Sequence, residues 1–327
     1  MGSNSRSLLQ SFLEVVNTLA KNLQNGTLEL VELARGGVSL DDVGYVVRRN
    51  APVLVLWCLF VFVIARMCCG GRGSRKVKTR ENYEPGKVYL HQHVPASGLP
   101  SLSPFCLKLE MFLRLADIPY ENVYKSLGME PGPKGKIPWI EYNGRAMADS
   151  GLIIQFFKEE LEIDLNRTLS TTDRAISRAF VKMLEENTYW WGLVYFRWIE
   201  NFDVIGSLFE VGWFMHNVLL RRAARGLSKT LWAQGIGRHS PEDIYAITEK
   251  DIMAVSEFLG EKPFFMGEEP TEADATVYGF MAEILWAAPE SSDLYALVTE
   301  KCPNVREYCV RMTRRYWQDW EGLADKC

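Results

Sequence analysis

The residues with the clearest chemical potential are the run Ser-Pro-Phe-Cys at positions 103–106, between a strand-like segment and a helical one. Ser103 can cap that helix by accepting hydrogen bonds from its first free N–H groups. Pro104 suits the first helical position, where a missing N–H costs nothing. A helix N-terminus stabilises a thiolate, so thiol redox sites place a cysteine where Ser103 stands. The arrangement of such a site is therefore kept without its attacking thiol, and only Cys106 remains.

The elements that position this turn alternate between strand and helix. We expect strands at Val88–His93, Tyr120–Tyr124, Ile137–Tyr142 and Arg145–Ala148, and helices at Pro104–Ala116 and Ser150–Leu161. The dipeptide Asn143-Gly144 between the last two strands is the strongest short signal for a β-hairpin. This order predicts a mixed sheet with helices packed on it, an α/β domain of thioredoxin-like build.

The rest of the chain is essentially all helical. We expect helices at Thr172–Glu200, Asp243–Gly260 and Val305–Gln318, and a further one that begins at the capping sequence Thr271-x-x-Asp274. The aromatic stripe in residues 189–198 is typical of packing and not of a ligand pocket. Residues 201–240 give no clear pattern, and their basic run, residues 221–229, indicates a solvated face that on an anchored protein could meet the bilayer.

The first third of the chain has a different character. Apolar residues recur at three- and four-residue steps over residues 7–23, which predicts an amphipathic helix within the segment 1–50. Residues 51–65 carry no charge and are apolar on every helical face, so we expect a transmembrane helix over residues 51–69. A buried core helix is the alternative. A cleaved signal peptide is disfavoured because the run begins so far from the N-terminus.

Basic residues concentrate after this apolar run. Six lie among residues 66–80, against three at a similar distance before it, which places the C-terminal side in the cytosol. Residues 70–86 are expected to form a basic linker. The glycosylation sequence Asn25-Gly26-Thr27 suits an anchor in a secretory-route membrane, whereas a short anchor with basic flanks also suits the mitochondrial outer membrane. A single-pass membrane protein follows from either.

Composition excludes several classes of function. The 327 residues have a formal net charge of −4, which gives no general case for nucleic-acid binding. The seven cysteines include no Cys-x-x-Cys pair, so neither a disulfide framework nor a cysteine metal site is expected. His91 and His93 would share one face of a strand, but no third ligand stands nearby, and we predict no metal.

Three features resemble the glutathione transferase fold, a thioredoxin-like domain followed by an all-helical domain. One is the capping sequence Thr271-x-x-Asp274, which resembles the capping box of the core helix in the helical domain. Ile137-Pro138 stands where that fold places a cis-proline whose preceding residue meets the cysteinyl part of glutathione. Asp149-Ser150 stands where it holds the γ-glutamyl group at a helix N-terminus. More narrowly, the runs at residues 99–108, 135–143 and 235–240 resemble the failed axon connections family, which is related to the metaxins and to cadmium-responsive proteins.

This resemblance implies a thioredoxin-like domain at residues 87–162 and an all-helical domain at residues 163–327, with glutathione as the implied cofactor. Two classes of function stay open. In the first, a membrane-tethered transferase-like module binds an unidentified protein partner, in axon development as the family implies. In the second, an active transferase conjugates a small electrophile, and Ser103 stabilises the glutathione thiolate. The fold also allows a homodimer. Ser103 could equally be only a cap, and Cys106 only a buried apolar residue.

Overall fold

The computed structural model describes residues 77–96, 98–125, 132–208 and 215–319. The sequence-based expectations for the amphipathic helix at 7–23, the glycosylation sequence at Asn25, the transmembrane helix at 51–69 and the first part of the linker all lie outside these ranges. Within the described ranges, no helix is long and apolar enough to cross a bilayer.

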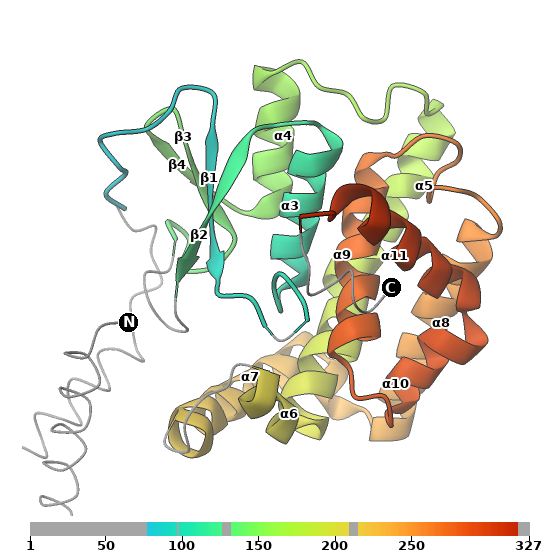
Figure 1. Ribbon diagram of the computed structural model, residues 1–327. Helices are drawn as coiled ribbons and strands as arrows, with labels where there is room; N and C mark the ends of the chain where they lie inside the picture. The colour runs from blue at the N-terminus through green and yellow to red at the C-terminus, as the bar shows by residue number, and fades with distance from the viewer. Residues whose placement is uncertain (1–76, 97, 126–131, 209–214, 320–327) are drawn as a thin grey trace, which may run out of the picture. The chain divides into compact units, whose positions relative to one another are not determined.

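The first described domain is a four-stranded sheet with the strand order β2-β1-β3-β4 (Figure 1). Its strands are β1 (Val88–His93), β2 (Tyr120–Lys125), β3 (Trp139–Tyr142) and β4 (Arg145–Ala148). Strand β1 pairs parallel to β2 and antiparallel to β3, and β3 pairs antiparallel to β4. Helices α3 (Pro104–Leu115) and α4 (Ser150–Glu160) pack against each other beside the sheet. This confirms the predicted thioredoxin-like domain.

Strand β3 begins two residues later than the sequence suggests, because Ile137 and Pro138 belong to the loop before it. Proline has no N–H to donate to a ladder, so it stands outside the paired segment. The hairpin between β3 and β4 turns at Asn143 and Gly144, both with positive φ (47° and 76°). That is the conformation that an Asn-Gly hairpin turn requires.

The second domain is all helical, as predicted. Its elements are α5 (Thr171–Lys182), η1 (Met183–Glu200), α6 (Phe202–Leu208), η2 (Met215–Leu220), α7 (Arg221–Gln234), η3 (Ile236–Arg238), α8 (Pro241–Leu259), α9 (Glu272–Ala287), α10 (Asp293–Ala296), η4 (Leu297–Lys301) and α11 (Pro303–Tyr316). The long helix expected at Thr172–Glu200 is the α-helix α5 followed directly by η1, which is π-helical over its whole length. The pattern of apolar residues in the sequence does not distinguish α-helical turns from π-helical turns.

The two domains meet where α3 packs on α9. Every residue of α9 from Ala273 to Ala287 is buried. Gly279 makes the contact close, because a Cβ there would lie 2.7 Å from the carbonyl oxygen of Pro104 and 2.8 Å from the backbone nitrogen of Lys108. No other residue fits at this distance without moving a backbone. The first turn of α3, which follows Ser103, therefore rests directly on the central helix of the second domain.

Helix α9 begins at a fully buried carboxylate. Asp274 is 0% exposed and accepts four hydrogen bonds: from the N–H of Phe265 (2.7 Å), from the N–H and hydroxyl of Thr271 (2.8 and 2.9 Å), and from the hydroxyl of Tyr308 (2.9 Å). Burial raises the pKa of Asp274, although each of these donors acts to lower it. The predicted capping sequence is thus a junction that joins α9, the loop before it and α11.

Replacing Asp274 with alanine should destabilise the fold strongly. Several buried donors would lose their acceptor together, and we expect the free energy of unfolding in urea to fall by at least about 3 kcal/mol. Ser170→Ala is the matched control, because it removes the exposed cap of α5 and should lower that free energy by about 0.5–2 kcal/mol. Equal losses in the two variants would show that burial adds nothing to the role of Asp274.

Candidate functional site

The register of the sheet brings the candidate residues to one edge. His91 near the C-terminal end of β1 pairs with Trp139 at the start of β3, and Trp139 pairs with Ala148 at the end of β4. The chain leaves β1 towards Ser103, enters β3 from Pro138 and leaves β4 at Asp149. Three segments that are distant in sequence therefore meet at the same end of the sheet, as the residues of one site must.

Ser103 is the N-cap of α3. Its backbone is extended (φ −114°, ψ 116°), and its hydroxyl oxygen accepts from the N–H of Cys106 at 3.4 Å. Its own N–H donates to the hydroxyl oxygen of Ser101 at 3.2 Å. Ser103 is half-buried, and its hydroxyl hydrogen is not used in the capping bond. The hydroxyl group can thus accept the capping bond through its oxygen and donate its hydrogen, either to the thiol of Cys106 or to a ligand.

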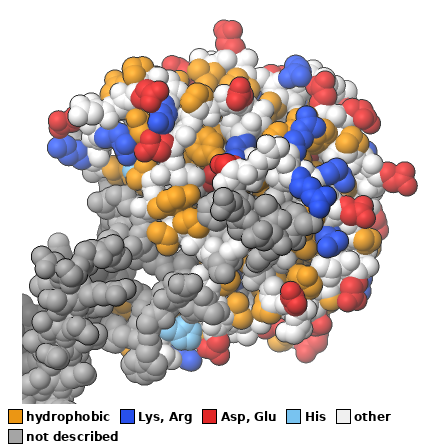
Figure 2. Space-filling model, viewed as in Figure 1, with side chains coloured by type: hydrophobic (Ala, Val, Ile, Leu, Met, Phe, Trp, Pro, Cys, Tyr) orange, Lys and Arg blue, Asp and Glu red, His pale blue; other side chains and the backbone are white. Residues whose placement is uncertain are grey.

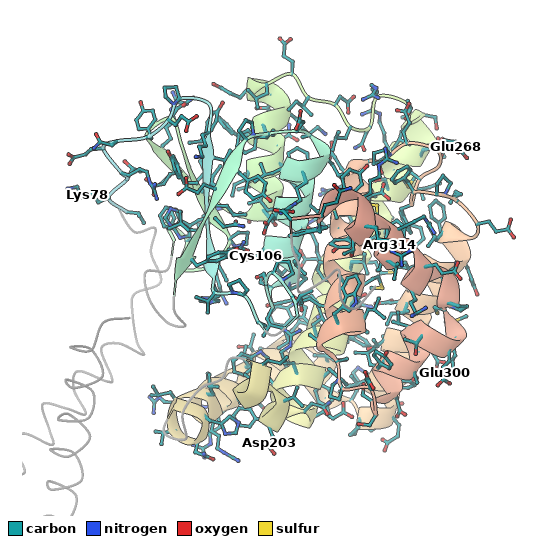
Figure 3. The ribbon with its side chains drawn as sticks, viewed as in Figure 1. Lys78, Cys106, Asp203, Glu268, Glu300 and Arg314 are labelled. Atoms are coloured by element: carbon teal, nitrogen blue, oxygen red, sulfur yellow. The ribbon has the colours of Figure 1, made fainter. Side chains whose placement is uncertain are left out.

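Cys106 lies inside the domain on the first turn of α3 (Figure 3). It is 0% exposed, and burial raises the pKa of its thiol to about 12, against hydrogen bonds from Ser103 and Ser101 that act to lower it. Desolvation therefore outweighs the helix N-terminus, and the thiol stays protonated at neutral pH. The structure favours the interpretation of Cys106 as a buried apolar residue over that of a nucleophile.

The peptide bond between Ile137 and Pro138 is cis, as in the fold that the sequence resembles. Pro138 is buried and Ile137 is half-buried. The next residue, Trp139, stacks its ring on that of His91, with centroids 3.6 Å apart and planes 13° from parallel. His91 Nε2 lies 2.7 Å from Glu141 Oε1, so this histidine belongs to a buried polar pair. The described residues contain no group of three metal-ligating side chains.

Asp149 is the N-cap of α4 and has an unusual backbone. Its φ of 87° is in the region that favours glycine, and residues held there often lie at ligand sites. One carboxylate oxygen, Oδ1, accepts from the N–H groups of Gly151 (3.1 Å) and Leu152 (3.2 Å). The other, Oδ2, lies 3.8 Å from the ammonium of Lys134. The side chain is 51% exposed, whereas Ser150 beside it is buried.

These residues fit the two ends of a γ-glutamyl group unequally. The carboxylate of Asp149 is exposed and could pair with an α-ammonium group. The first-turn N–H groups that would hold the ligand's carboxylate are partly taken, because Asp149 itself occupies two of them. The N–H and hydroxyl of Ser150 remain as candidate donors. Glutathione would thus be held by Asp149, Ser150 and the backbone of Ile137, with Ser103 near its thiol.

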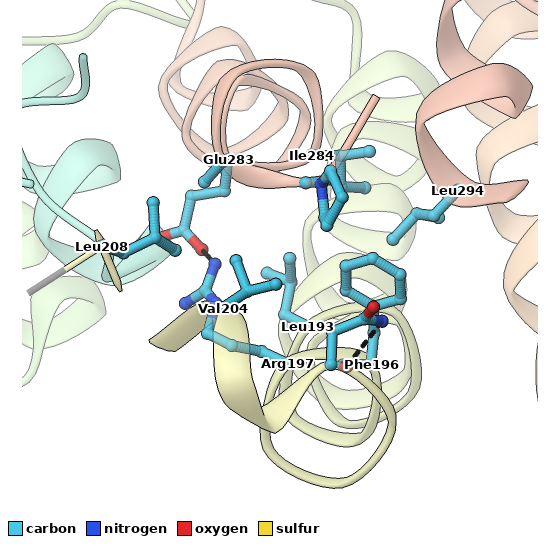
Figure 4. Close-up of a pocket in the computed structure, with 12 residues that line it drawn as sticks. Leu193, Phe196, Arg197, Val204, Leu208, Glu283, Ile284 and Leu294 are labelled. Atoms are coloured by element: carbon cyan, nitrogen blue, oxygen red, sulfur yellow. Dashed lines mark hydrogen bonds and ion pairs between the residues drawn. The ribbon is translucent and has the colours of Figure 1, made fainter. Parts of the chain in front are cut away.

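A buried ion pair that the sequence pattern did not reveal supports the loop before Ser103. Arg197 in η1 donates to Glu283 in α9 (2.6 Å) and to the carbonyl oxygen of Leu102 (2.8 Å). Figure 4 shows the pair at the end of a cavity whose other walls are Asn201 and apolar side chains, which come mainly from η1, α6, α9 and α10. The enclosed space is about 10 Å³, enough for one water molecule at most.

Next to this cavity is an open hollow of about 630 Å³, which shares Val204 and Leu208 with it and is also lined by Trp286, Tyr295 and Arg306. Its volume falls within the range of small-molecule sites. Sequence reasoning missed both features. Arg197 and Glu283 are 86 residues apart, and only the packing of η1 on α9 brings them together.

Comparison with known proteins adds independent evidence. The model of the glutathione S-transferase N-terminal domain matches residues 104–203, and that of the C-terminal domain matches residues 248–312. Failed axon connections from Drosophila melanogaster is 33% identical over 264 residues, 76% of this chain and 62% of that protein. This chain thus spans less than two thirds of that relative's length.

Two other relatives cover more of their own length. The isoprene-epoxide–glutathione S-transferase of Rhodococcus sp. (strain AD45) is 30% identical over 240 residues, 70% of this chain and 99% of that enzyme. Metaxin-2 of Mus musculus is 24% identical over 221 residues, 65% of this chain and 82% of that protein. The similarity thus extends through both domains.

The burial of Cys106 makes a chemical prediction. In the folded protein, iodoacetamide at neutral pH should leave Cys106 unmodified, because its thiol is neither accessible nor ionised. After unfolding in urea the same residue should be alkylated at the rate of an ordinary thiol. Peptide mass spectrometry measures both states on one sample, and the unfolded sample is the control. Rapid labelling of Cys106 in the folded protein would contradict the assignment.

Removing Arg197 should expose the dependence of the loop on its ion pair. Arg197→Met leaves Glu283 buried without a cation, and we expect the free energy of unfolding to fall by about 3–5 kcal/mol. In Arg197→Met/Glu283→Leu no unpaired charge remains, so the double variant should recover part of that loss. Strictly additive effects in this cycle would show that the two groups do not interact.

The same pair makes stability depend on pH. Burial raises the pKa of Glu283 from 4.5 to about 7, although Arg197 acts to lower it. Because the folded-state pKa lies above the unfolded-state pKa, protonation of Glu283 stabilises the fold. This contribution is fully present below the unfolded-state pKa and is lost as the pH rises through the folded-state pKa. Arg197→Met removes the opposing cation and raises this pKa further, so the stability of the variant should continue to fall at pH values above about 7, where that of the wild type levels off.

Proposed function

This chain belongs to the glutathione S-transferase family, where it groups with failed axon connections and the metaxins. From this premise we propose that it is a membrane-tethered binding module. In this proposal the transferase-like domains recruit a ligand or partner instead of carrying out thiol chemistry. The proposal depends on one observation above all. The helix position that would hold an attacking thiol carries the capping hydroxyl of Ser103, and the nearby thiol of Cys106 is buried and protonated.

The ligand proposed for the site is glutathione, or another molecule with a free γ-glutamyl end. The exposed carboxylate of Asp149 would pair with its ammonium group, Ser150 would donate to its carboxylate, and the cis peptide at Ile137-Pro138 would meet the peptide part. Ser103 would take the thiol end. Bound glutathione would supply a thiol, and these residues of the chain would bind and orient the glutathione.

The tether is proposed to be the apolar run at residues 51–69, with the basic residues that follow it facing the cytosol. On this proposal residues 70–86 link the anchor to a thioredoxin-like domain at 87–162 and a helical domain at 163–327. A role in axon development, the subject of the Drosophila relative's name, is part of the same proposal. The protein partner would be recruited at the membrane.

The second candidate function is conjugation of a small epoxide to glutathione. It is favoured by the Rhodococcus relative, an isoprene-epoxide–glutathione S-transferase almost the whole length of which this chain matches. The hydroxyl hydrogen of Ser103, which the capping bond leaves unused, would donate to the glutathione sulfur and stabilise the thiolate. The open hollow lined by Trp286, Tyr295 and Arg306 has the volume of a small-molecule site, but no residue of the proposed glutathione site lines it.

Calorimetric titration of the full chain with glutathione and with S-methylglutathione tests the binding proposal. We expect both to bind, because the γ-glutamyl end and not the thiol is what the site holds. Asp149→Asn should weaken both at least tenfold while unfolding free energy changes by only a few tenths of a kcal/mol, roughly, since asparagine caps a helix about as well as aspartate. If Asp149→Asn binds both ligands as tightly as the wild type does, the ligand site lies elsewhere.

An epoxide-conjugation assay on the same protein separates the two functions. The binding proposal expects no turnover above the uncatalysed rate. Turnover that disappears in Ser103→Ala, while that variant still binds glutathione and loses only about 0.5–2 kcal/mol of stability, would establish the enzyme instead. Failure of both titration and turnover would leave the chain as a protein-binding module alone.

A further inference from the structure

We propose that the solvent-facing stripe of helix α7 is a docking surface for an anionic phospholipid bilayer. The stripe is formed by Arg221, Arg222, Arg225, Lys229 and Trp232. It deepens the membrane-tethered function proposed above by adding a second contact, in the helical domain, that does not use the anchor. Helix α7 lies at the lower end of the ribbon in Figure 1.

The spacing of the stripe places its members on one face. Arg222, Arg225, Lys229 and Trp232 follow one another at three, four and three residues, and all four are exposed. The opposite face, with Leu227 and Leu231, packs on the small cluster of apolar residues between η1 and α8. Helix α7 is therefore amphipathic, with its orientation on the protein already fixed.

Few acidic residues lie close to this stripe in the sequence. From Val211 to Ser240 the chain has five basic residues and no Asp or Glu, although the whole chain has a net charge of −4. Arg221 alone has a described carboxylate partner, Asp203, at 4.0 Å, and that side chain is itself 87% exposed. Like charges at this spacing destabilise a helix, so the stripe is a feature that folding alone does not favour.

Other parts of the described structure mix basic and acidic residues more closely than α7 does. On the face shown in Figure 2, basic and acidic side chains are interspersed. Two basic residues of other helical elements have acidic partners: Lys301 lies 2.6 Å from Glu249, and Arg174 lies 3.0 Å from Asp164. Helix α7 has no acidic residue of its own.

Trp232 decides between a bilayer and other anionic partners. Its side chain is 59% exposed, the most exposed large apolar side chain among the described residues, and it continues the basic stripe at its C-terminal end. Arg238 holds it by donating to its carbonyl oxygen at 3.2 Å, with the guanidinium 5.6 Å from the ring centroid. Tryptophan beside lysine and arginine is typical of the interface between headgroups and acyl chains.

A single short stripe suits a surface better than a nucleic-acid groove. Its charges extend over about 12 Å, because eight residue steps of about 1.5 Å separate Arg221 from Lys229. Headgroups need no register, and each basic residue near an anionic leaflet adds to the attraction. A tether at residues 51–69 would hold the helical domain close to the bilayer and raise the effective concentration of its headgroups.

Hydrogen exchange on the full chain tests this surface. The protein is prepared with phosphatidylcholine vesicles, and again with vesicles in which phosphatidylserine is included. We expect the amides of residues 221–234 to exchange about tenfold more slowly with phosphatidylserine only, and the difference to vanish in 1 M salt, where the screening length is about 3 Å. Equal exchange in the two membranes would overturn the proposal.

Charge reversal supplies the matched control. Arg222→Glu/Arg225→Glu/Lys229→Glu should abolish the protection. Arg178→Glu/Lys250→Glu/Arg306→Glu changes the same charge at exposed positions of α5, α8 and α11 and should leave the protection intact. Trp232→Ala should reduce it without changing its salt dependence. Equal behaviour of the two triple variants, or equal protection by duplex RNA, would contradict a lipid surface.

The anchor is assessed by a separate signal. Flotation of the chain with pure phosphatidylcholine vesicles reports the tether, because that surface offers α7 no net charge. A chain that fails to float but still shows protection of α7 with phosphatidylserine would refute the tether and support the docking surface. A chain that floats but shows no protection of α7 would support the tether and refute the docking surface.

Discussion

The close packing of α3 against α9 is the contact on which the rest of the structure depends. Gly279 lets the backbone of the central helix approach the first turn of α3, and Asp274 fixes where that central helix begins. Since Ser103 precedes this turn, the position of the candidate site is set from the second domain as much as from the sheet. The two domains are therefore one structural unit around the site.

Buried charges reinforce that dependence from the side of η1. Arg197 reaches across to Glu283 and to the loop before Ser103, and Lys108 in α3 is paired with Glu185. Pairs of this kind are weak sources of net stability, but removing one partner is strongly destabilising. Arg197 thus ties the loop to η1 and α9, and Lys108 ties α3 to η1. The turn at Ser103 thus has rigid supports, whatever ligand it binds.

Much of this could be predicted from sequence because the signals are local. The cap at Ser103, the Asn143-Gly144 turn and the capping sequence at Thr271 act within a few residues, so they show in the chain itself. The ion pair between Arg197 and Glu283 and the contact at Gly279 depend on residues far apart in sequence. The burial of Cys106 determines that its thiol is protonated, and its place on the first turn of a helix, which is all that the sequence gives, could not show this.

Helix α7 has few ties to this framework. Its main contacts are with η1, η2 and η3, and only Leu231 of its fourteen residues is buried. Substitutions on its outer face can therefore accumulate without disturbing the packing of α3 on α9. If α7 docks on a bilayer as proposed, substitutions on this helix alone would change membrane binding, while the two domains and the candidate site at the end of the sheet stay unchanged.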